Sequence, residues 1–126
     1  RIVVRGEVPA GAVHRWYQRC LLCVACPLYE PFGLTPFEAA ACGCALVCSR
    51  TGAFEMLVQP GVNGELVEVG DPQGLAAAVR SVLADPHRAV AMGQAARERV
   101  MREFSLAREA EGIGRVYQQL FDSASR

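Results

Sequence analysis

Residues 28–43 read L-Y-E-P-F-G-L-T-P-F-E-A-A-A-C-G, and the rest of the chain is organised around this stretch. Within it, Thr35 is a favourable helix cap, Pro36 fits the first helical position, and Glu38 completes a T-x-x-E capping box. Alanines, which are strong helix formers, follow, and Gly43 is placed to end the helix. The stretch therefore predicts a strand end, a tight turn containing glycine and a short helix that begins at Thr35. Free backbone N–H groups at such a helix start bind anions, phosphate above all.

The length and composition indicate one ordinary soluble globular domain, which we expect to cover residues 1–126. The 52% of apolar residues suffice for a core, and the formal net charge of +0 favours neither nucleic acid nor an anionic membrane as a partner. No signal peptide is apparent, and uncharged runs such as residues 20–29 are too short to span a bilayer. We therefore expect a cytoplasmic protein. Because the chain opens on Arg1 without an initiator methionine, we also expect a fragment of a longer protein.

Three of the six cysteines are closely spaced and raise the question of a metal site. Cys20, Cys23 and Cys26 have the spacing C-x2-C-x2-C before Pro27, which overlaps a ferredoxin-type iron–sulfur run. However, L-L-C-V-A-C is an apolar run typical of a buried parallel strand, in which Cys23 and Cys26 face opposite ways. The next cysteine, Cys42, lies too far along the chain to be the fourth ligand of such a run. We therefore expect no metal, and free thiols that pack in the core of a protein from a reducing cytosol.

Short apolar segments alternate with helical patterns along the chain. The expected strands are residues 2–5, 21–26, 45–49 and 65–69. Helical spacing is expected at residues 13–20 and 54–58, and after the caps Asp71, Asp85 and Ser105. Strands and helices in alternation with short links predict a doubly wound α/β fold with a parallel sheet. Ligands bind beyond the carboxyl ends of such strands, so we expect the loop at Glu30 and the turn at residues 51–53 to open on the same edge.

The two glutamates of the central stretch each allow a structural and a functional interpretation. Glu38 needs no function if it serves the helix cap, and Glu30 is a solvated turn residue by default. Together they suggest more, because carboxylates accept paired hydrogen bonds from vicinal hydroxyls. The backbone N–H groups of Gly33, Leu34 and Thr35 between them are placed to hold a phosphate. A ligand with sugar hydroxyls on both sides of a phosphate is a nucleotide sugar.

The stretch E-P-F-G-L-T-P-F-E-A-A-A-C-G also resembles the E-x7-E segment of retaining GT-B glycosyltransferases, the group-1, family-4-like enzymes that include glycogen and sucrose-phosphate synthases. The resemblance extends over nearly the whole chain. Residues 3–8 are similar to the V-x-x-x-G-x-V strand and turn of that family, residues 45–55 to its P-V-V-A-S-x-x-G-G-x-x-E stretch, and residues 61–67 to its D-G-x-x-G-x-L-V segment. It implies a Rossmann-like sheet, the truncated C-terminal, donor-binding half of a GT-B fold.

The same resemblance implies roles for the residues of the central stretch. Glu30 would be catalytic and contact hydroxyls of the donor sugar, and Glu38 would bind the ribose of the nucleotide. The residues implied beside the sugar and the diphosphate are Phe32, Gly33, Leu34 and Thr35. The family transfers hexosyl groups with retention and needs no metal or other cofactor, and this chain has no D-x-D motif.

The acceptor-binding domain of that family would precede Arg1, together with the first strands of the donor domain. We therefore expect the nucleotide sugar as this chain's own partner. An acceptor glycan, lipid or small molecule would be bound by the missing domain. The chain alone is not expected to turn over, and membrane association of the full-length protein stays open. An uncovered strand at residues 2–5 would leave a sheet edge through which a homodimer forms.

Several positions depart from the pattern of the family. Leu21 stands where the family often has Asp, Cys26-Pro27 where it has Pro-Ser, and Gly52-Ala53 in place of Gly-Gly. These departures favour an alternative, a non-catalytic interaction module that kept the fold and lost the activity. A generic dinucleotide-binding domain is a weaker third possibility, because no G-x-G-x-x-G follows any expected strand.

Overall fold

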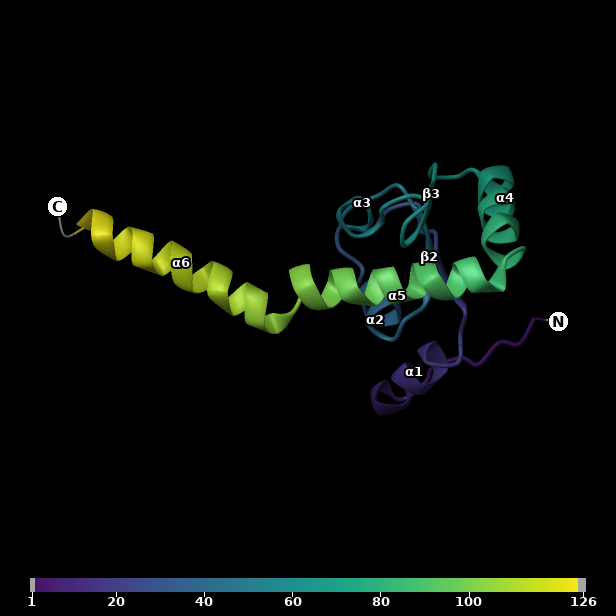
Figure 1. The fold of residues 1–126 in the computed structure, drawn as a ribbon, viewed down its shortest axis with the longest axis horizontal. Helices are drawn as coiled ribbons and strands as arrows, with labels where there is room; N and C mark the ends of the chain where they lie inside the picture. Colours follow the sequence, from purple (N-terminus) through teal and green to yellow (C-terminus); the bar gives the residue numbers. More distant parts are fainter. Residues whose placement is uncertain (1, 125–126) are drawn as a thin grey trace.

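The computed structural model describes residues 2–124 as a small parallel sheet with helices on both sides and one helix that projects from the body (Figure 1). The elements in chain order are α1 (Ala10–Tyr17), β1 (Leu22–Ala25), α2 (Leu34–Ala41), β2 (Ala45–Ser49), α3 (Phe54–Leu57), β3 (Gly64–Val67), α4 (Pro72–Leu83), α5 (Pro86–Glu103) and α6 (Leu106–Ala124). Helices and strands alternate up to β3, as the α/β prediction requires. Three helices then follow one another.

The sheet has three parallel strands in the order β1-β2-β3. Cys23 pairs with Leu46, and Leu46 pairs in turn with Gly64. Every residue of the central strand β2 is buried, which explains its unbroken run of small and apolar side chains. The predicted parallel sheet is confirmed.

The side chains of β2 alternate between two hydrophobic cores, one on each face of the sheet. Leu46 and Cys48 join the core under α2, whereas Ala45 and Val47 join the core under α4. Helix α5 contributes to both cores, with Ala96 and Val100 in the first and with Ala89 and Met92 in the second. Helices therefore cover both faces of the sheet, and the doubly wound arrangement is confirmed.

The predicted helix caps in the second half of the chain are confirmed. The Asp71 side chain accepts hydrogen bonds from the backbone N–H groups of Gln73 and Gly74, at 3.1 and 2.9 Å. The Asp85 side chain accepts one from the N–H group of Arg88 at 3.0 Å. Each bond satisfies an N–H group that has no partner within its helix, so these short polar residues fix where α4 and α5 begin.

Helix α6 contacts little of the rest of the domain. Ser105 caps it by accepting a hydrogen bond from the N–H group of Arg108 at 3.4 Å, and none of its described residues is buried. Ile113, Tyr117 and Leu120 lie along one side of the helix and are more than half exposed. Figure 1 shows α6 extending away from the sheet and its covering helices. The helix therefore carries an apolar side that the described part of the chain does not cover.

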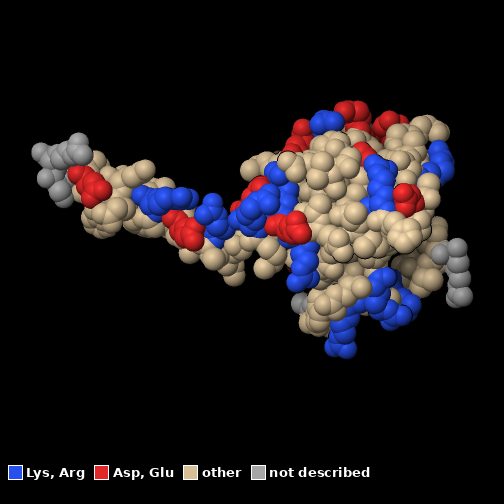
Figure 2. Space-filling model, viewed as in Figure 1, with Lys and Arg blue, Asp and Glu red and all other residues tan. Residues whose placement is uncertain are grey.

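Charged residues lie mainly on the solvent side of the long helices. Figure 2 shows basic and acidic side chains close together around the junction of α5 and α6, where Arg99 and Arg102 pair with Glu103, and Arg108 pairs with Glu111. Most of the charged run in α5 is thus a solvated helix face, but Arg99 within it is only 17% exposed. Within residues 2–124, no helix combines the length and the apolar character needed to cross a membrane.

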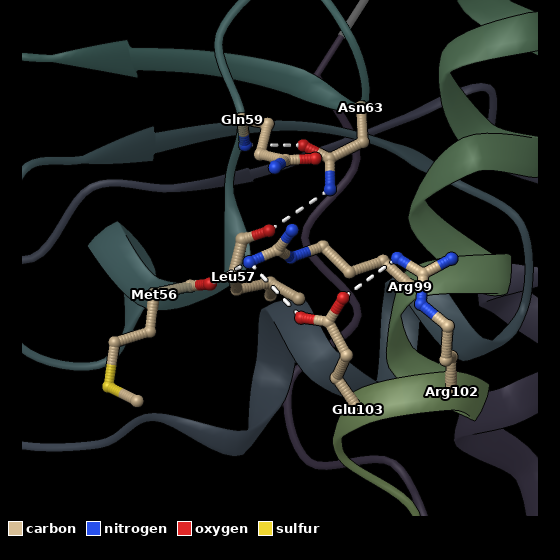
Figure 3. Close-up of polar contacts among 7 residues, drawn as sticks. All are labelled: Met56, Leu57, Gln59, Asn63, Arg99, Arg102 and Glu103. Atoms are coloured by element: carbon tan, nitrogen blue, oxygen red, sulfur yellow. Dashed lines mark hydrogen bonds and ion pairs between the residues drawn. The ribbon is translucent and has the colours of Figure 1, made fainter.

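A buried asparagine closes the turn between α3 and β3. Asn63 is only 1% exposed, accepts the backbone N–H group of Gln59 at 2.7 Å and donates to the carbonyl oxygen of Leu57 at 3.0 Å (Figure 3). Both polar ends of the amide are satisfied, which compensates for its burial. The side chain thereby ties the end of α3 to the start of β3.

Two strand predictions need correction. Residues 2–5 form no strand, because a strand requires a hydrogen-bonded neighbour and no described segment pairs with them. The two edges of the described sheet are therefore β1 and β3, not residues 2–5 as expected. The last strand covers Gly64–Val67 and so ends two residues before the predicted limit at position 69.

Candidate functional site

Two loops meet at the carboxyl edge of the sheet, one after β1 and one after β2. Residues 30–33 form the first, which we call the Glu30 loop. The turn at Gly52 lies so close to it that a Cβ atom on Gly52 would overlap the carbonyl oxygen of Glu30 and lie 2.7 Å from that of Pro31. The prediction that both loops open on the same edge is confirmed, and their backbones touch there.

Glu30 is half-buried and holds its own loop together. One carboxylate oxygen, Oε1, accepts a hydrogen bond from the backbone N–H group of Phe32 at 3.4 Å. Within residues 2–124, no hydrogen bond joins the other oxygen to the protein. The carboxylate is thus oriented by its loop and retains one oxygen for a ligand.

The start of α2 differs from the predicted capping box. The helix begins at Leu34 instead of Thr35, and its N-cap is Gly33, with a φ of 72° and no side-chain hydrogen bond to the cap. Only glycine suits this position, because a Cβ atom there would lie 2.6 Å from the Phe54 ring and 2.7 Å from Cγ of Glu30. The capping box is therefore wrong, and the first N–H groups of α2 are left without a side-chain cap.

The side chain of Thr35 is engaged by α1 instead. It lies near the Tyr17 hydroxyl, as does the carboxylate of Glu38. Burial raises the pKa of Tyr17 most, the Cys23 thiol and the Glu38 carboxylate raise it further, and the Thr35 side chain partly opposes them. Thr35 and Glu38 thus lie beside α1, and no side chain caps α2.

Glu38 is exposed and faces a groove between α1 and α2. The groove has a volume of about 320 Å³. Its lining residues are Val13, His14, Tyr17, Glu38, Ala41 and Cys42. Since Glu38 has no capping role, its carboxylate is available beside this groove. Tyr17 and His14 were not predicted as site residues, because only the packing of α1 on α2 brings them there.

A second hollow lies on the other side of the start of α2. It has a volume of about 530 Å³ and extends from the Glu30 loop to the junction of α5 and α6. Phe32 and Leu34 border it on one side, and Leu106 and Arg108 on the other. Of the predicted site residues, Glu30, Phe32, Gly33 and Leu34 therefore lie together. Thr35 and Glu38 face α1.

Stacked aromatic rings form the floor of the second hollow. The rings of Phe32 and Phe37 stack with centroids 5.1 Å apart and planes 6° apart. The ring of Phe104 meets Phe37 edge-on, with centroids also 5.1 Å apart and planes at 72°. Phe37 and Phe104 were not predicted as part of the site. Their contacts join residues far apart in the sequence.

Three of the cysteines, Cys23, Cys44 and Cys48, are buried in the packing of the sheet, whereas Cys20 is exposed. All six are free, and Cys23 and Cys26 face opposite cores, as the strand interpretation predicts. Burial first, and neighbouring thiols second, raise the pKa of Cys23 to about 11 and that of Cys44 to about 12. Within residues 2–124, no group of three or more His, Cys, Asp or Glu side chains is arranged to hold a metal ion.

Similar proteins share this fold and sequence. Residues 1–99 match the family model described as "Glycosyl transferases group 1". A lipopolysaccharide core biosynthesis mannosyltransferase, LpcC, from Rhizobium leguminosarum bv. viciae is 43% identical over 95% of this chain and 34% of its own length.

Among solved structures, a sucrose-phosphate synthase from Thermosynechococcus elongatus aligns over 98% of this chain with a TM-score of 0.88 and 36% identity, and over 31% of its own length. Anabaena HepE in complex with UDP-glucose aligns over 83% of this chain and 29% of its own, with a TM-score of 0.76 and 25% identity. The chain thus spans about one third of the length of these proteins.

Proposed function

Because the chain belongs to the glycosyl transferases group 1 and has the fold of a C-terminal GT-B domain, we propose that it binds a nucleotide-diphosphate sugar, the donor in a sugar transfer. The observation that carries the proposal is the position of two carboxylates, Glu30 and Glu38, around an uncapped helix start at one edge of the sheet. HepE has a similar fold, and its structures in complex with UDP and with UDP-glucose support the same class of ligand.

The diphosphate is placed at the start of α2. The N–H groups of Leu34 and Thr35 lie in the first turn of the helix, where the helix dipole favours an anion. Gly33 has no side chain to block the approach of the diphosphate, and the backbone of Phe32 adjoins it. This assignment needs no metal ion and no cofactor, because the protein's own dipoles supply the positive field.

The ribose is assigned to Glu38. A carboxylate has two acceptor oxygens, so it can take hydrogen bonds from both hydroxyls of the ribose. The groove between α1 and α2 beside Glu38 has room for the nucleoside, and Tyr17 and Thr35 fix the helix surface next to it.

The sugar of the donor is assigned to Glu30. The carboxylate oxygen that is not used by the Glu30 loop is available to hydroxyls of the sugar, and we assign Glu30 the catalytic role. The transfer would follow the E-x7-E pattern, in which a hexosyl group moves with retention of its anomeric configuration.

The acceptor side of the reaction lies outside this chain. Transfer requires donor and acceptor to be held in one cleft, and the chain spans about one third of its relatives. An acceptor glycan, lipid or small molecule would bind to a further domain of a cytoplasmic protein. Residues 1–126 are then one partial donor-binding domain, which is inactive alone.

Calorimetric titration with UDP-, GDP- and ADP-sugars tests the proposal directly. We expect binding of one nucleotide class, weaker by about tenfold to a hundredfold in Glu38→Ala, because a charge-assisted hydrogen bond contributes roughly 1.5 to 3 kcal/mol. Glu98→Ala is the matched control, since it removes an exposed carboxylate on α5, away from both grooves. Equally unmeasurable affinity for all the nucleotide sugars would reject donor binding by this chain.

The alternative, a non-catalytic interaction module, is favoured by the exposed apolar side of α6. Under it, the titrations give no heat with any nucleotide sugar. A charge on α6, as in Leu120→Lys, then abolishes binding to a protein partner. Under the donor proposal, Leu120→Lys leaves nucleotide affinity unchanged, because Leu120 lines neither the hollow at the start of α2 nor the groove at Glu38.

A further inference from the structure

The last turn of α5 contacts both elements that support the Glu30 loop. The first contact runs through aromatic rings. Phe104, the residue that ends α5, packs edge-on against Phe37 of α2, and the Phe37 ring stacks on Phe32 in the loop. Phe37 is only 7% exposed, so it cannot follow a change in one neighbour without disturbing the other.

The second contact runs through Arg99, one turn earlier in α5. Its guanidinium donates to the carbonyl oxygen of Met56 in α3 at 2.8 Å and pairs with Glu103 at 3.2 Å (Figure 3). Helix α3 begins at Phe54, whose buried ring lies against Gly33 of the loop. Arg99 therefore fixes the short helix that supports the other side of the loop.

The position of Arg99 leaves part of its guanidinium buried and unpaired. Its side chain is 17% exposed, and its Nε atom is buried without a hydrogen-bond partner among the residues described. Arg102 also pairs with Glu103, at 2.7 Å, but it is 66% exposed and, within residues 2–124, makes no hydrogen bond to α3. Arg102 shows that an arginine can pair with Glu103 while it stays exposed. The burial of Arg99 therefore accompanies its hydrogen bond to the Met56 carbonyl oxygen.

We propose that Arg99 and Phe104 are positioning residues for the Glu30 loop, which they hold from two sides in the conformation that receives the donor sugar. The part that concerns the sugar rests on the proposed function. The part that concerns the loop does not. Because Glu30 orients its carboxylate through the N–H group of Phe32, any loosening of Phe32 or Gly33 also releases the carboxylate.

Hydrogen–deuterium exchange of the chain without ligand tests the positioning role. In Phe104→Ala and in Arg99→Ala, we expect exchange at residues 32–35 to rise about fivefold or more, since opening of this loop no longer has to break contacts with α5. The matched controls are Val100→Ala, which removes volume from the same core, and Arg102→Ala, which removes the other partner of Glu103. Both should leave exchange at these residues unchanged.

Conservative variants keep the test decisive if an alanine variant does not fold. Phe104→Tyr retains the ring and should exchange as the parent does, whereas Phe104→Leu should show the faster exchange. Arg99→Lys retains the charge but not the geometry that reaches Met56, and should also exchange faster. If exchange at residues 32–35 is unchanged in all of these variants, or rises equally in the controls, the positioning role is overturned.

Titration with UDP and UDP-glucose then separates the two proposals. In Phe104→Leu and Arg99→Lys, we expect affinity for UDP-glucose to fall about threefold or more and affinity for UDP to fall less, because the start of α2 holds the diphosphate of both ligands, whereas Glu30 contacts the sugar alone. Equal losses of affinity for UDP and UDP-glucose would overturn the proposed link between the Glu30 loop and the sugar. If the parent chain binds neither ligand, the proposed function fails, and the exchange data still decide whether α5 positions the loop.

Discussion

Gly52 lies directly against the backbone of Glu30. A Cβ atom at Gly52 would overlap the carbonyl oxygen of Glu30, and the φ of 52° at Gly52 is one that other residues rarely adopt. The turn after β2 therefore fixes the position of the Glu30 loop at the carboxyl edge of the sheet. Sequence comparison draws attention to the missing second glycine at Ala53, but Ala53 is buried and accommodated, and Gly52 makes the close approach.

Gly52→Ala should therefore destabilise the chain and displace the Glu30 loop. The new methyl group meets backbone that cannot move aside, and the positive φ adds strain, so we expect a loss of about 1 to 3 kcal/mol. Urea unfolding followed by circular dichroism measures it. Gly112→Ala in α6 is the control, because nothing lies within 4 Å of a Cβ atom there. Helix propensity should stabilise that variant or leave it unchanged.

Asn63→Ala should be among the more damaging single substitutions in this chain. It leaves the N–H group of Gln59 and the carbonyl oxygen of Leu57 without the partner they have now, and we expect a loss of about 2 to 3 kcal/mol in unfolding free energy. Gln59→Ala is a matched control, because the bond to Asn63 uses the backbone of Gln59 and survives. If both variants have the same urea midpoint, the amide of Asn63 is not what holds the turn.

The raised thiol pKa values predict a loss of stability in alkali. The pKa of Cys23 rises from 9.0 to about 11 on folding, mainly through burial. Above pH 9 the unfolded chain releases a proton that the folded chain keeps, so stability is constant below that pH and falls between pH 9 and 11. The shift corresponds to roughly 3 kcal/mol for complete titration.

Urea midpoints at pH 8, 9 and 10 measure this effect. Cys23→Ala should flatten the decline above pH 9, whereas Cys20→Ala, which removes an exposed thiol, should leave it as in the parent. Part of the decline should persist in Cys23→Ala, because burial also raises the pKa of Cys44 to about 12. An equal decline in the parent and Cys23→Ala would show that Cys23 is not the titrating group.

Local patterns predicted the elements whose causes are local. The run A-L-V-C-S gave a strand over residues 45–49, and Asp71 and Asp85 gave the starts of α4 and α5, because each cap lies within three residues of the groups that it binds. The predicted family and the C-terminal GT-B fold are confirmed by the family match and by the structural likeness. The roles of Glu30 and Glu38 stay predictions.

Predictions failed where tertiary contacts decide the local structure. The capping box was wrong because the helix begins after Gly33, where the Phe54 ring leaves room for glycine alone, and because Thr35 lies beside Tyr17 of another helix. No sequence pattern joins Phe104 to Phe37, since β2, α3, β3, α4 and α5 intervene between them in the chain. Sequence patterns therefore could not predict Phe37 and Phe104, which support the candidate site from elements far apart in the chain.

Self-association through the edge of the sheet is the remaining prediction. Strand β1 is one of the two edge strands of the described sheet, its Val24 is 47% exposed, and an unpaired strand edge accepts another strand. We expect a concentration-dependent dimer, weakened about tenfold or more in Val24→Lys, because a lysine at this position must be desolvated when a second strand pairs. Sedimentation velocity over a range of concentrations measures the dimerisation.

The control is Leu120→Lys on α6, which places the same charge on the other exposed apolar surface. If Leu120→Lys gives the monomer and Val24→Lys does not, the contact between copies is made by α6 and the sheet edge stays unpaired.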